Sequence, residues 1–361
     1  MNPRRSPTLL VKDLGGLAVY YPGQALMQRV PRPLLARMAL LGGDVVRRVA
    51  RADERLAREE LHRLFGSRPL PQAADDILRE AWRQTMFNEL EVLRYPALNP
   101  STVESVCVIE GREHLDAALA RGKGAIVLIG HFGANQMIMP ALGHAGYPMN
   151  QLSAPPPVWA EILRDTRTTP LWEKVLERRW TLEQRLPVRH INVFRFLRPA
   201  YECLQRNEVL GLAFDGGGGK RWAKIKFLSR NANISTQPIQ LARKTGAAIL
   251  PTVVVREPGE RRHRIIVHPA LDYQRHKDRL EEARINLQAF TDIFAEWVAR
   301  HPAHYLNFLL LRYKVRATDV VPFFDDYPAA EGQLDPEAAM RHLRAAAEKR
   351  GGAGEEESSE P

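Results

Sequence analysis

The stretch that decides the fold is Gly124-Ala-Ile-Val-Leu-Ile-Gly130, which His131-Phe-Gly-Ala-Asn-Gln136 follows directly. Its first seven residues are all apolar or glycine, and they predict a buried strand because the run is too short for a core helix. From Met137 onward the sequence predicts a helix, whose first turn tolerates Pro140. Open α/β sheets bind ligands where a strand ends and a helix begins, so His131 is a candidate site residue. The alternative is an ordinary hydrogen-bonded loop histidine.

A second polar cluster follows a second predicted strand. Residues 208–214 predict a buried strand, and Asp215-Gly-Gly-Gly-Gly-Lys-Arg221 comes directly after it. If the two strands are parallel neighbours, His131 and Asp215 lie at the same edge of the sheet. The four glycines are either a flexible loop or an anion-binding loop, in which bare backbone N–H groups and two cations hold phosphate. The spacing differs from that of a P-loop, and neither Ser nor Thr follows Lys220.

The order of the predicted elements indicates an α/β fold, with a central mixed, mostly parallel β-sheet flanked by helices and with an N-terminal helical segment. Besides the two strands above, we expect strands at residues 105–110, 147–152, 188–193, 223–228, 247–255 and 264–268. We expect helices at residues 72–95, 111–120, 194–206, 239–244 and 278–300.

The first 70 residues alternate between basic and apolar side chains. Apolar residues recur every three to four positions between Leu34 and Val49, with arginines between them, which predicts an amphipathic helix interrupted at Gly42-Gly43. Such a helix either packs on the core or lies on an anionic membrane surface.

The composition limits the class of protein. The chain has 361 residues, 45% of them hydrophobic, enough for one large domain or a domain with an added module, and we expect no membrane-spanning helix and no signal peptide. The net charge is +10, and four of the 42 acidic residues lie in the last seven positions. The basic remainder favours nucleic acid, anionic lipid or an acidic carrier protein as partner. Cys107 and Cys203 lie in apolar contexts, so we expect reduced core thiols.

These motifs, in their order, resemble the lysophospholipid-type acyltransferases, and within them the branch that makes bacterial lipid A. The resemblance covers about residues 85–315. It is carried by His131-Phe-Gly133 after its strand, Asp215 with its glycines, Ser235-Thr-Gln-Pro238 before a helix and a strand, and a closing segment from His301-Pro302 through the aromatic residues to Tyr313. Where the family has an acid five positions after the histidine, this chain has Gln136. Where it commonly has an arginine in a Tyr-Arg-Pro-type segment, this chain has Ala154.

The resemblance implies that His131 is the general base of acyl transfer to a lipid hydroxyl. Gln136 can fix the ring tautomer by accepting an N–H through its amide oxygen, although it supplies no negative charge; Asp215 is the alternative acid. The residues expected to contact substrate are Gly133, Asn135, Gly216, Gly217, Gly218, Lys220, Arg221 and Arg164, the last as a substitute for the arginine missing at position 154.

The implied reaction moves a fatty acyl chain from an acyl-carrier-protein or acyl-CoA thioester to a hydroxyl of a lipid A-like or other glycolipid or phospholipid acceptor. No cofactor or metal is implied, and no nucleic acid partner is expected. The alternative is a catalytically impaired, lipid-binding member of the same fold. We expect a peripheral protein on the cytoplasmic face of the bacterial inner membrane, with a helical membrane-surface segment at 1–98, an acyltransferase domain at 99–315 and a loose tail at 316–361.

Overall fold

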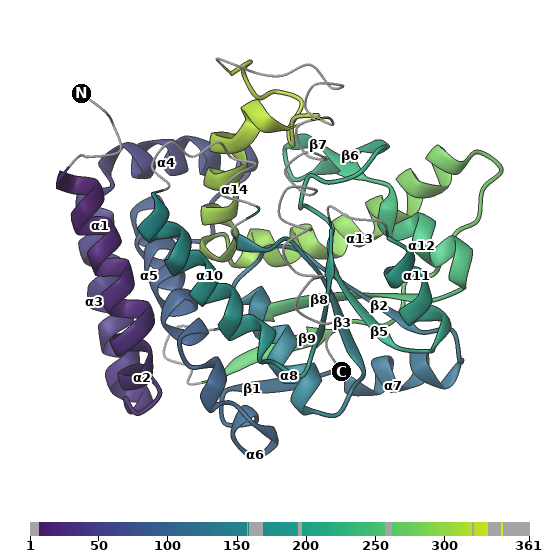
Figure 1. The fold of residues 1–361 in the computed structure, drawn as a ribbon. Helices are drawn as coiled ribbons and strands as arrows, with labels where there is room; N and C mark the ends of the chain where they lie inside the picture. Colours follow the sequence, from purple (N-terminus) through teal and green to yellow (C-terminus); the bar gives the residue numbers. More distant parts are fainter. Residues whose placement is uncertain are drawn as a thin grey trace.

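The computed structural model describes residues 7–156, 158, 169–193, 197–256, 262–319, 321–330 and 341. They form the predicted α/β fold around a seven-stranded sheet of order β1-β9-β8-β2-β5-β3-β4 (Figure 1). The strands from β8 to β4 in this order run parallel, and β9 and β1 run the other way. The bounds are β1 Cys107–Glu110, β2 Ala125–Ile129, β3 Met149–Ser153, β4 Arg189–Asn192, β5 Val209–Ala213, β8 Ala248–Val255 and β9 His263–Val267.

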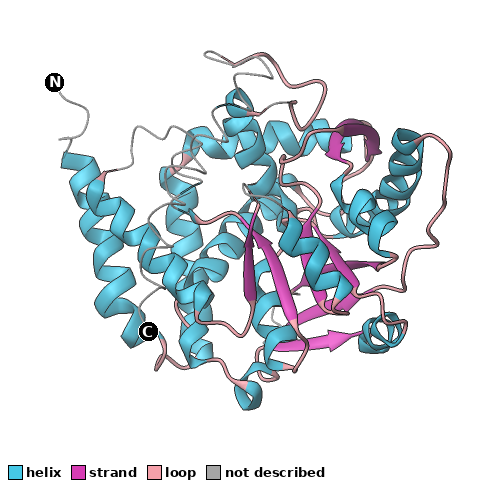
Figure 2. Ribbon diagram, turned by 45° about the vertical axis from the view of Figure 1, so that its right-hand side comes forward, coloured by secondary structure: helices cyan, strands magenta, loops and turns pink. Residues whose placement is uncertain are grey.

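Helices cover both faces of this sheet (Figure 2). On β2, Ile126 and Leu128 join one core, and Ala125, Val127 and Ile129 join the other, because successive side chains of a strand point to opposite faces. The first core includes α11 (Arg198–Gln205), α12 (Gln237–Thr245), α13 (Arg279–Arg300) and α14 (Ala303–Val315). The second includes α7 (Arg112–Ala120), α8 (Ile138–His144) and α10 (Pro170–Gln184).

The N-terminal segment is helical, and its side chains contribute to both cores. Its bounds are α1 Pro7–Ala18, a π-helical turn η2 Val19–Gly23, α2 Gln24–Met27, α3 Arg32–Val49, α4 Arg51–Phe65, α5 Ala74–Val92 and a 3₁₀ turn η3 Tyr95–Ala97. Short helical pieces follow at α6 Pro100–Val103, η4 Asn135–Met137 and η5 Arg316–Thr318. No helix of the described residues is both long and apolar enough to cross a membrane.

The predicted interruption at Gly42-Gly43 is wrong, because α3 runs through both glycines. A Cβ atom at Gly43 would lie 2.6 Å from the Cα atom of Arg83 on α5. The glycine therefore serves close packing of two helix backbones, an advantage that offsets its low helix propensity. Gly42 meets the flexible side chain of Met86, at 3.0 Å.

An antiparallel hairpin lies outside the main sheet and was only half predicted. Strand β6 (Trp222–Phe227) matches the strand expected at residues 223–228, whereas no strand was predicted where β7 (Arg230–Ser235) lies. Along β7 the buried residues Ala232 and Ile234 alternate with partly exposed ones. The alternation was too short to predict a strand, because only Ala232 and Ile234 are apolar and asparagine is depleted in strands.

Residues 321–327 form a strap across this hairpin, so the expectation of a loose tail from residue 316 is wrong for this part. The backbone N–H of Asn233 donates to the carbonyl of Phe323 at 2.8 Å, and Phe324 makes a β-bridge to Ala232. Phe323 and Phe324 are fully buried. Two consecutive phenylalanines, too few to show a period, tie the segment to the core. Residues 320, 331–340 and 342–361 of the predicted tail lie outside the described residues.

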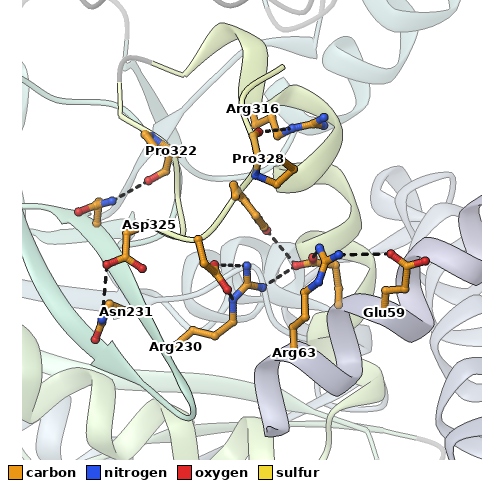
Figure 3. A network of polar contacts seen from close by, with 12 residues as sticks. Glu59, Arg63, Arg230, Asn231, Arg316, Pro322, Asp325 and Pro328 are labelled. Atoms are coloured by element: carbon orange, nitrogen blue, oxygen red, sulfur yellow. Dashed lines mark hydrogen bonds and ion pairs between the residues drawn. The ribbon is translucent and has the colours of Figure 1, made fainter. Parts of the chain in front are cut away.

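A buried arginine fastens the strap to both the hairpin and α4 (Figure 3). The guanidinium of Arg230 donates to Glu60 of α4 at 2.7 Å and also binds Asp326 of the strap. The ring of Phe324 lies 3.7 Å from the same guanidinium, and Tyr327 donates its hydroxyl to Glu60 at 3.1 Å. Every charge in the buried part of this cluster has an opposite charge beside it, which burial requires.

Candidate active site

The parallel register of β2 and β5 brings the two predicted polar clusters together. Ile129 pairs with Ala213 at the carboxyl ends of these neighbouring strands. Two residues further along each strand are His131 and Asp215, so the register itself sets them opposite each other. The prediction that both lie at one edge of the sheet is therefore confirmed.

His131 and Asp215 form a hydrogen-bonded pair. The Nδ1 atom of His131 lies 2.6 Å from Oδ1 of Asp215, and the backbone N–H of His131 donates to Oδ2 at 2.9 Å. The hydroxyl of Tyr305 also donates to Oδ2, at 3.0 Å. The carboxylate side chain has no exposed surface, whereas the side chain of His131 is 38% exposed. A buried acid thus holds one ring nitrogen while the ring itself reaches the surface.

The other ring nitrogen of His131 makes no hydrogen bond to another described residue. One face of the ring is covered by Phe308, whose ring is parallel within 3° and 4.4 Å away between centroids. With Nδ1 bound to a carboxylate, the proton of the neutral imidazole belongs on Nδ1, which leaves Nε2 as an acceptor. The pair can therefore accept a proton from a hydroxyl at Nε2 and stabilise the resulting imidazolium.

Gln136 lies elsewhere than predicted. Its amide oxygen accepts an N–H from Arg179 of α10 at 3.4 Å, and Asp215 occupies the Nδ1 position that we assigned to it. Arg179 also pairs with Glu89 and, at 3.6 Å, with Glu183. Burial, together with the nearby charge of Glu89, raises the pKa of Glu183. A neutral amide at position 136 adds no third negative charge beside Glu89 and Glu183.

Two further predicted contacts lie beside His131. Gly133 has a φ of +60°, and both of its backbone polar groups are hydrogen-bonded within the protein. Its N–H donates to the carbonyl of His304 at 2.8 Å, and its carbonyl accepts from the side chain of Asn88 at 2.9 Å. Gly133 therefore shapes the loop and has no N–H left for a substrate. Asn135 opens the 3₁₀ turn η4 and is partly exposed, so it remains a candidate for substrate contact.

The glycine loop after Asp215 has the features of an anion-binding loop. The backbone N–H groups from Gly216 to Lys220 make no hydrogen bond to another described residue. Gly217 and Gly219 have φ angles of +77° and +133°, which side chains rarely allow. Lys220 and Arg221 are exposed at its end, and their side chains make no ion pair with any described residue. Successive free N–H groups beside two cations can hold a phosphate group.

The predicted substrate residue Arg164 lies outside the described residues. Three contacts that the sequence did not assign come from α14, namely those of Tyr305, Phe308 and Arg312. Their spacing of three and four positions places them on one face of a helix, which is the signal that could have found them. Among the described residues no group of three or more His, Cys, Asp or Glu side chains could hold a metal ion. Cys107 and Cys203 are buried free thiols, as predicted.

A histidine–carboxylate pair at the strand ends of a mostly parallel sheet defines a site for general-base chemistry, and the comparison with known families agrees with this class. Residues 3–315 match the bacterial lipid A biosynthesis acyltransferase family, and the chain belongs to that family. The resemblance seen in the sequence is therefore confirmed.

Two curated relatives are similar to part of the chain. Both are named phosphatidylinositol mannoside acyltransferase and come from Mycobacterium tuberculosis, strains CDC 1551 / Oshkosh and ATCC 25618 / H37Rv. Each is 31% identical over 220 residues, which is 59% of this chain. The match spans 63% of the length of each relative.

Proposed function

We propose that this protein is an O-acyltransferase that moves a fatty acyl chain from a thioester to a hydroxyl of a lipid acceptor. The observation that carries the proposal is the His131–Asp215 pair, with Nδ1 held at 2.6 Å and Nε2 unpaired among the described residues, in a chain of this family. The alternative of a catalytically impaired lipid-binding protein was based on Gln136 and Ala154. The buried carboxylate of Asp215 supplies the charge that Gln136 lacks, which favours an active enzyme.

In the proposed reaction Nε2 of His131 takes the proton from the acceptor hydroxyl as its oxygen attacks the thioester carbonyl. Asp215 stabilises the imidazolium that forms. When the tetrahedral intermediate collapses, the carbon–sulfur bond breaks and the ester bond remains. The imidazolium then gives its proton to the departing thiolate, so the pair returns to its starting state.

We assign phosphate binding to the glycine loop. Its free N–H groups from Gly216 onward, together with Lys220 and Arg221, suit a phosphate that orients either the acceptor lipid or the thioester donor. The donor is an acyl-carrier-protein or coenzyme A thioester, both of which carry phosphate. The acceptor is a glycolipid of the lipid A type or another phosphate-bearing lipid; the names of the family and of the mycobacterial relatives both favour a sugar-bearing lipid.

We propose that the N-terminal helices place the protein on an anionic membrane, as a peripheral protein on the cytoplasmic face of the inner membrane. Of the twelve exposed large hydrophobic side chains among the described residues, ten lie between residues 10 and 49. They are Leu10, Leu14, Val19, Tyr21, Leu26, Leu34, Leu40, Leu41, Val45 and Val49. Figure 1 shows α1 and α3 at one edge of the molecule.

Helix α3 shows how this surface is built. Leu35, Ala39 and Gly43 are its buried residues, while Leu41 and Val49 are 67% and 77% exposed. The apolar stripe that the sequence shows is thus turned largely to the outside, with exposed Arg37 and Arg48 within it. An exposed apolar face with arginines suits an interface between lipid tails and anionic headgroups.

Activity is tested with the purified full chain on vesicles. Acyl-carrier-protein and coenzyme A thioesters are supplied in parallel, with a lipid A precursor, a phosphatidylinositol mannoside or phospholipid alone in the membrane. We expect thiol release and a mass increase of one acyl chain on a single acceptor class, and loss of both signals in His131→Ala. Vesicle binding with neither signal on any acceptor would contradict the proposal and support the lipid-binding alternative.

Membrane docking is tested by vesicle flotation of two matched variants. Leu14 is 54% exposed on α1, and Leu280 is 53% exposed at the start of α13. Burial of a leucine side chain is worth about 1.5–3 kcal/mol, and about half of this is available to a half-exposed residue, so Leu14→Glu should weaken binding about tenfold. Leu280→Glu should bind as the wild type does. Equal binding by the two variants would contradict the assignment of this surface.

A further inference from the structure

Helix α14 touches each part of the site with one face. Tyr305, Phe308 and Arg312 follow one another at spacings of three and four residues, so they project from the same side of the helix. Tyr305 binds Asp215, Phe308 stacks on His131, and Arg312 packs against Gly217 of the glycine loop. We propose that this face of α14 is the positioning element of the site, with Tyr305 and Phe308 as positioning residues for the pair and Arg312 as the positioning residue for the loop. The inference rests on the proposed function.

Tyr305 completes the hydrogen bonds of Asp215. The carboxylate receives the Nδ1–H and the backbone N–H of His131 and, at 3.0 Å, the hydroxyl of Tyr305. Neither Tyr305 nor the Asp215 side chain has exposed surface, so water cannot replace this donor. Burial raises the pKa of Tyr305 far above its usual value, which keeps the hydroxyl protonated and donating. The hydroxyl therefore holds the carboxylate in one orientation and disperses part of its charge.

Phe308 acts on the other member of the pair. Its ring lies parallel to the imidazole at 4.4 Å, which stops the imidazole from rotating out of line with Asp215. The negative face of an aromatic ring also attracts a cation more than a neutral ring. Phe308 therefore favours the imidazolium, whereas the hydroxyl of Tyr305 weakens the pull of Asp215 on it. Loss of one residue or of the other should therefore change the His131–Asp215 pair in opposite directions.

Arg312 packs against the glycine loop and holds it in place. Its side chain is buried and donates to Asp319 at 2.9 Å. A Cβ atom at Gly217 would lie 2.6 Å from one guanidinium nitrogen and 2.7 Å from the other. The bare backbone of Gly217, at a φ of +77°, thus lies directly on a guanidinium whose place is set by an ion pair. This contact fixes the turn that exposes the free N–H groups of the loop.

The test is the basicity of His131, measured by NMR titration of its ring in the full chain, together with kcat and KM. Tyr305→Phe removes one hydroxyl at unchanged shape. The carboxylate of Asp215 then has one donor fewer, so we expect the His131 titration and the acidic limb of the rate profile to move to higher pH. We expect kcat to fall tenfold or more and KM to stay unchanged. Phe308→Leu should move both to lower pH.

Tyr327→Phe is the matched control, because Tyr327 is also buried and also donates to a buried carboxylate, that of Glu60, at 3.1 Å. It should change thermal stability without moving the His131 titration. Unmoved titrations in Tyr305→Phe and Phe308→Leu, or shifts of the same sign, would overturn the inference. Opposite shifts support it even if the wild type transfers no acyl chain, a result that would contradict the proposed function alone.

Discussion

Replacement of Asp215 by asparagine should nearly abolish acyl transfer, and the structure gives the reason. Three donors converge on the carboxylate, two from His131 and one from Tyr305. An amide offers one acceptor oxygen, so its NH₂ group must face at least one of these donors. In the serine protease triad, an amide at the orienting position lowers kcat about 10⁴-fold, or about 5.5 kcal/mol. We expect Asp215→Asn to lose about 10³- to 10⁴-fold in kcat.

Gln136→Glu restores the acid that the family has at this position and serves as the comparison. The amide oxygen of Gln136 meets Arg179, which already faces Glu89 and Glu183. A third carboxylate there cannot reach Nδ1, which Asp215 occupies. We therefore expect no gain in activity, a change in kcat of less than about fivefold, and a loss of stability of about 1 kcal/mol.

The assay is single-turnover acyl transfer on vesicles, with circular dichroism and thermal unfolding as controls for the fold. Full activity in Asp215→Asn would refute the assignment of the acid. A large gain in Gln136→Glu would show that position 136, rather than Asp215, is the natural partner of His131.

Three stability predictions follow from buried groups. Burial lowers the pKa of His304 to about 3. Below about pH 6.5 the unfolded chain therefore binds a proton at this histidine that the native state does not, so the free energy of unfolding falls as the pH drops toward 3. Between pH 7 and 4, denaturant unfolding should show a loss of unfolding free energy about 3 kcal/mol larger in the wild type than in His304→Gln. An equal pH dependence of stability in the two proteins would contradict a neutral His304. Arg230→Met should cost about 3 kcal/mol by leaving Glu60 buried beside fewer cations, and the double variant with Glu60→Met should recover most of it, whereas additive losses would contradict the pairing. Gly43→Ala should destabilise by about 1–3 kcal/mol because its Cβ meets the backbone of α5, while Gly42→Ala, which meets a flexible side chain, should be neutral or stabilising; the reverse order would contradict the helix contact.

The central strands β2 and β5 were predictable because burial on both faces leaves an unbroken run of apolar residues and glycine. The polar residue that ends each run marks the edge where the site lies. Their parallel pairing then follows from the α/β order of elements. The sequence alone therefore predicts that His131 and Asp215 lie at the same edge of the sheet.

The sequence left two candidates, Gln136 and Asp215, for the partner of His131, and it assigned no role to α14. Asp215 lies 84 positions from His131 and Tyr305 lies 90 positions from Asp215, so only the tertiary register decides which acid meets Nδ1. The family motif favours Gln136 as the residue that contacts the His131 ring. Gln136 is near His131 in sequence but faces Arg179 instead. The strap was missed because its few buried side chains, Phe323, Phe324 and Tyr327, show no helix or strand period.

If Nε2 of His131 takes the proton of the acceptor hydroxyl, His131→Gln should lose acyl transfer. The measurement is the rate of a single acyl transfer by this variant, at a thioester concentration that saturates the wild type. We predict a loss of about 10³-fold or more, with unchanged vesicle binding and unchanged thermal stability. Transfer at the wild-type rate by this variant would contradict the claim.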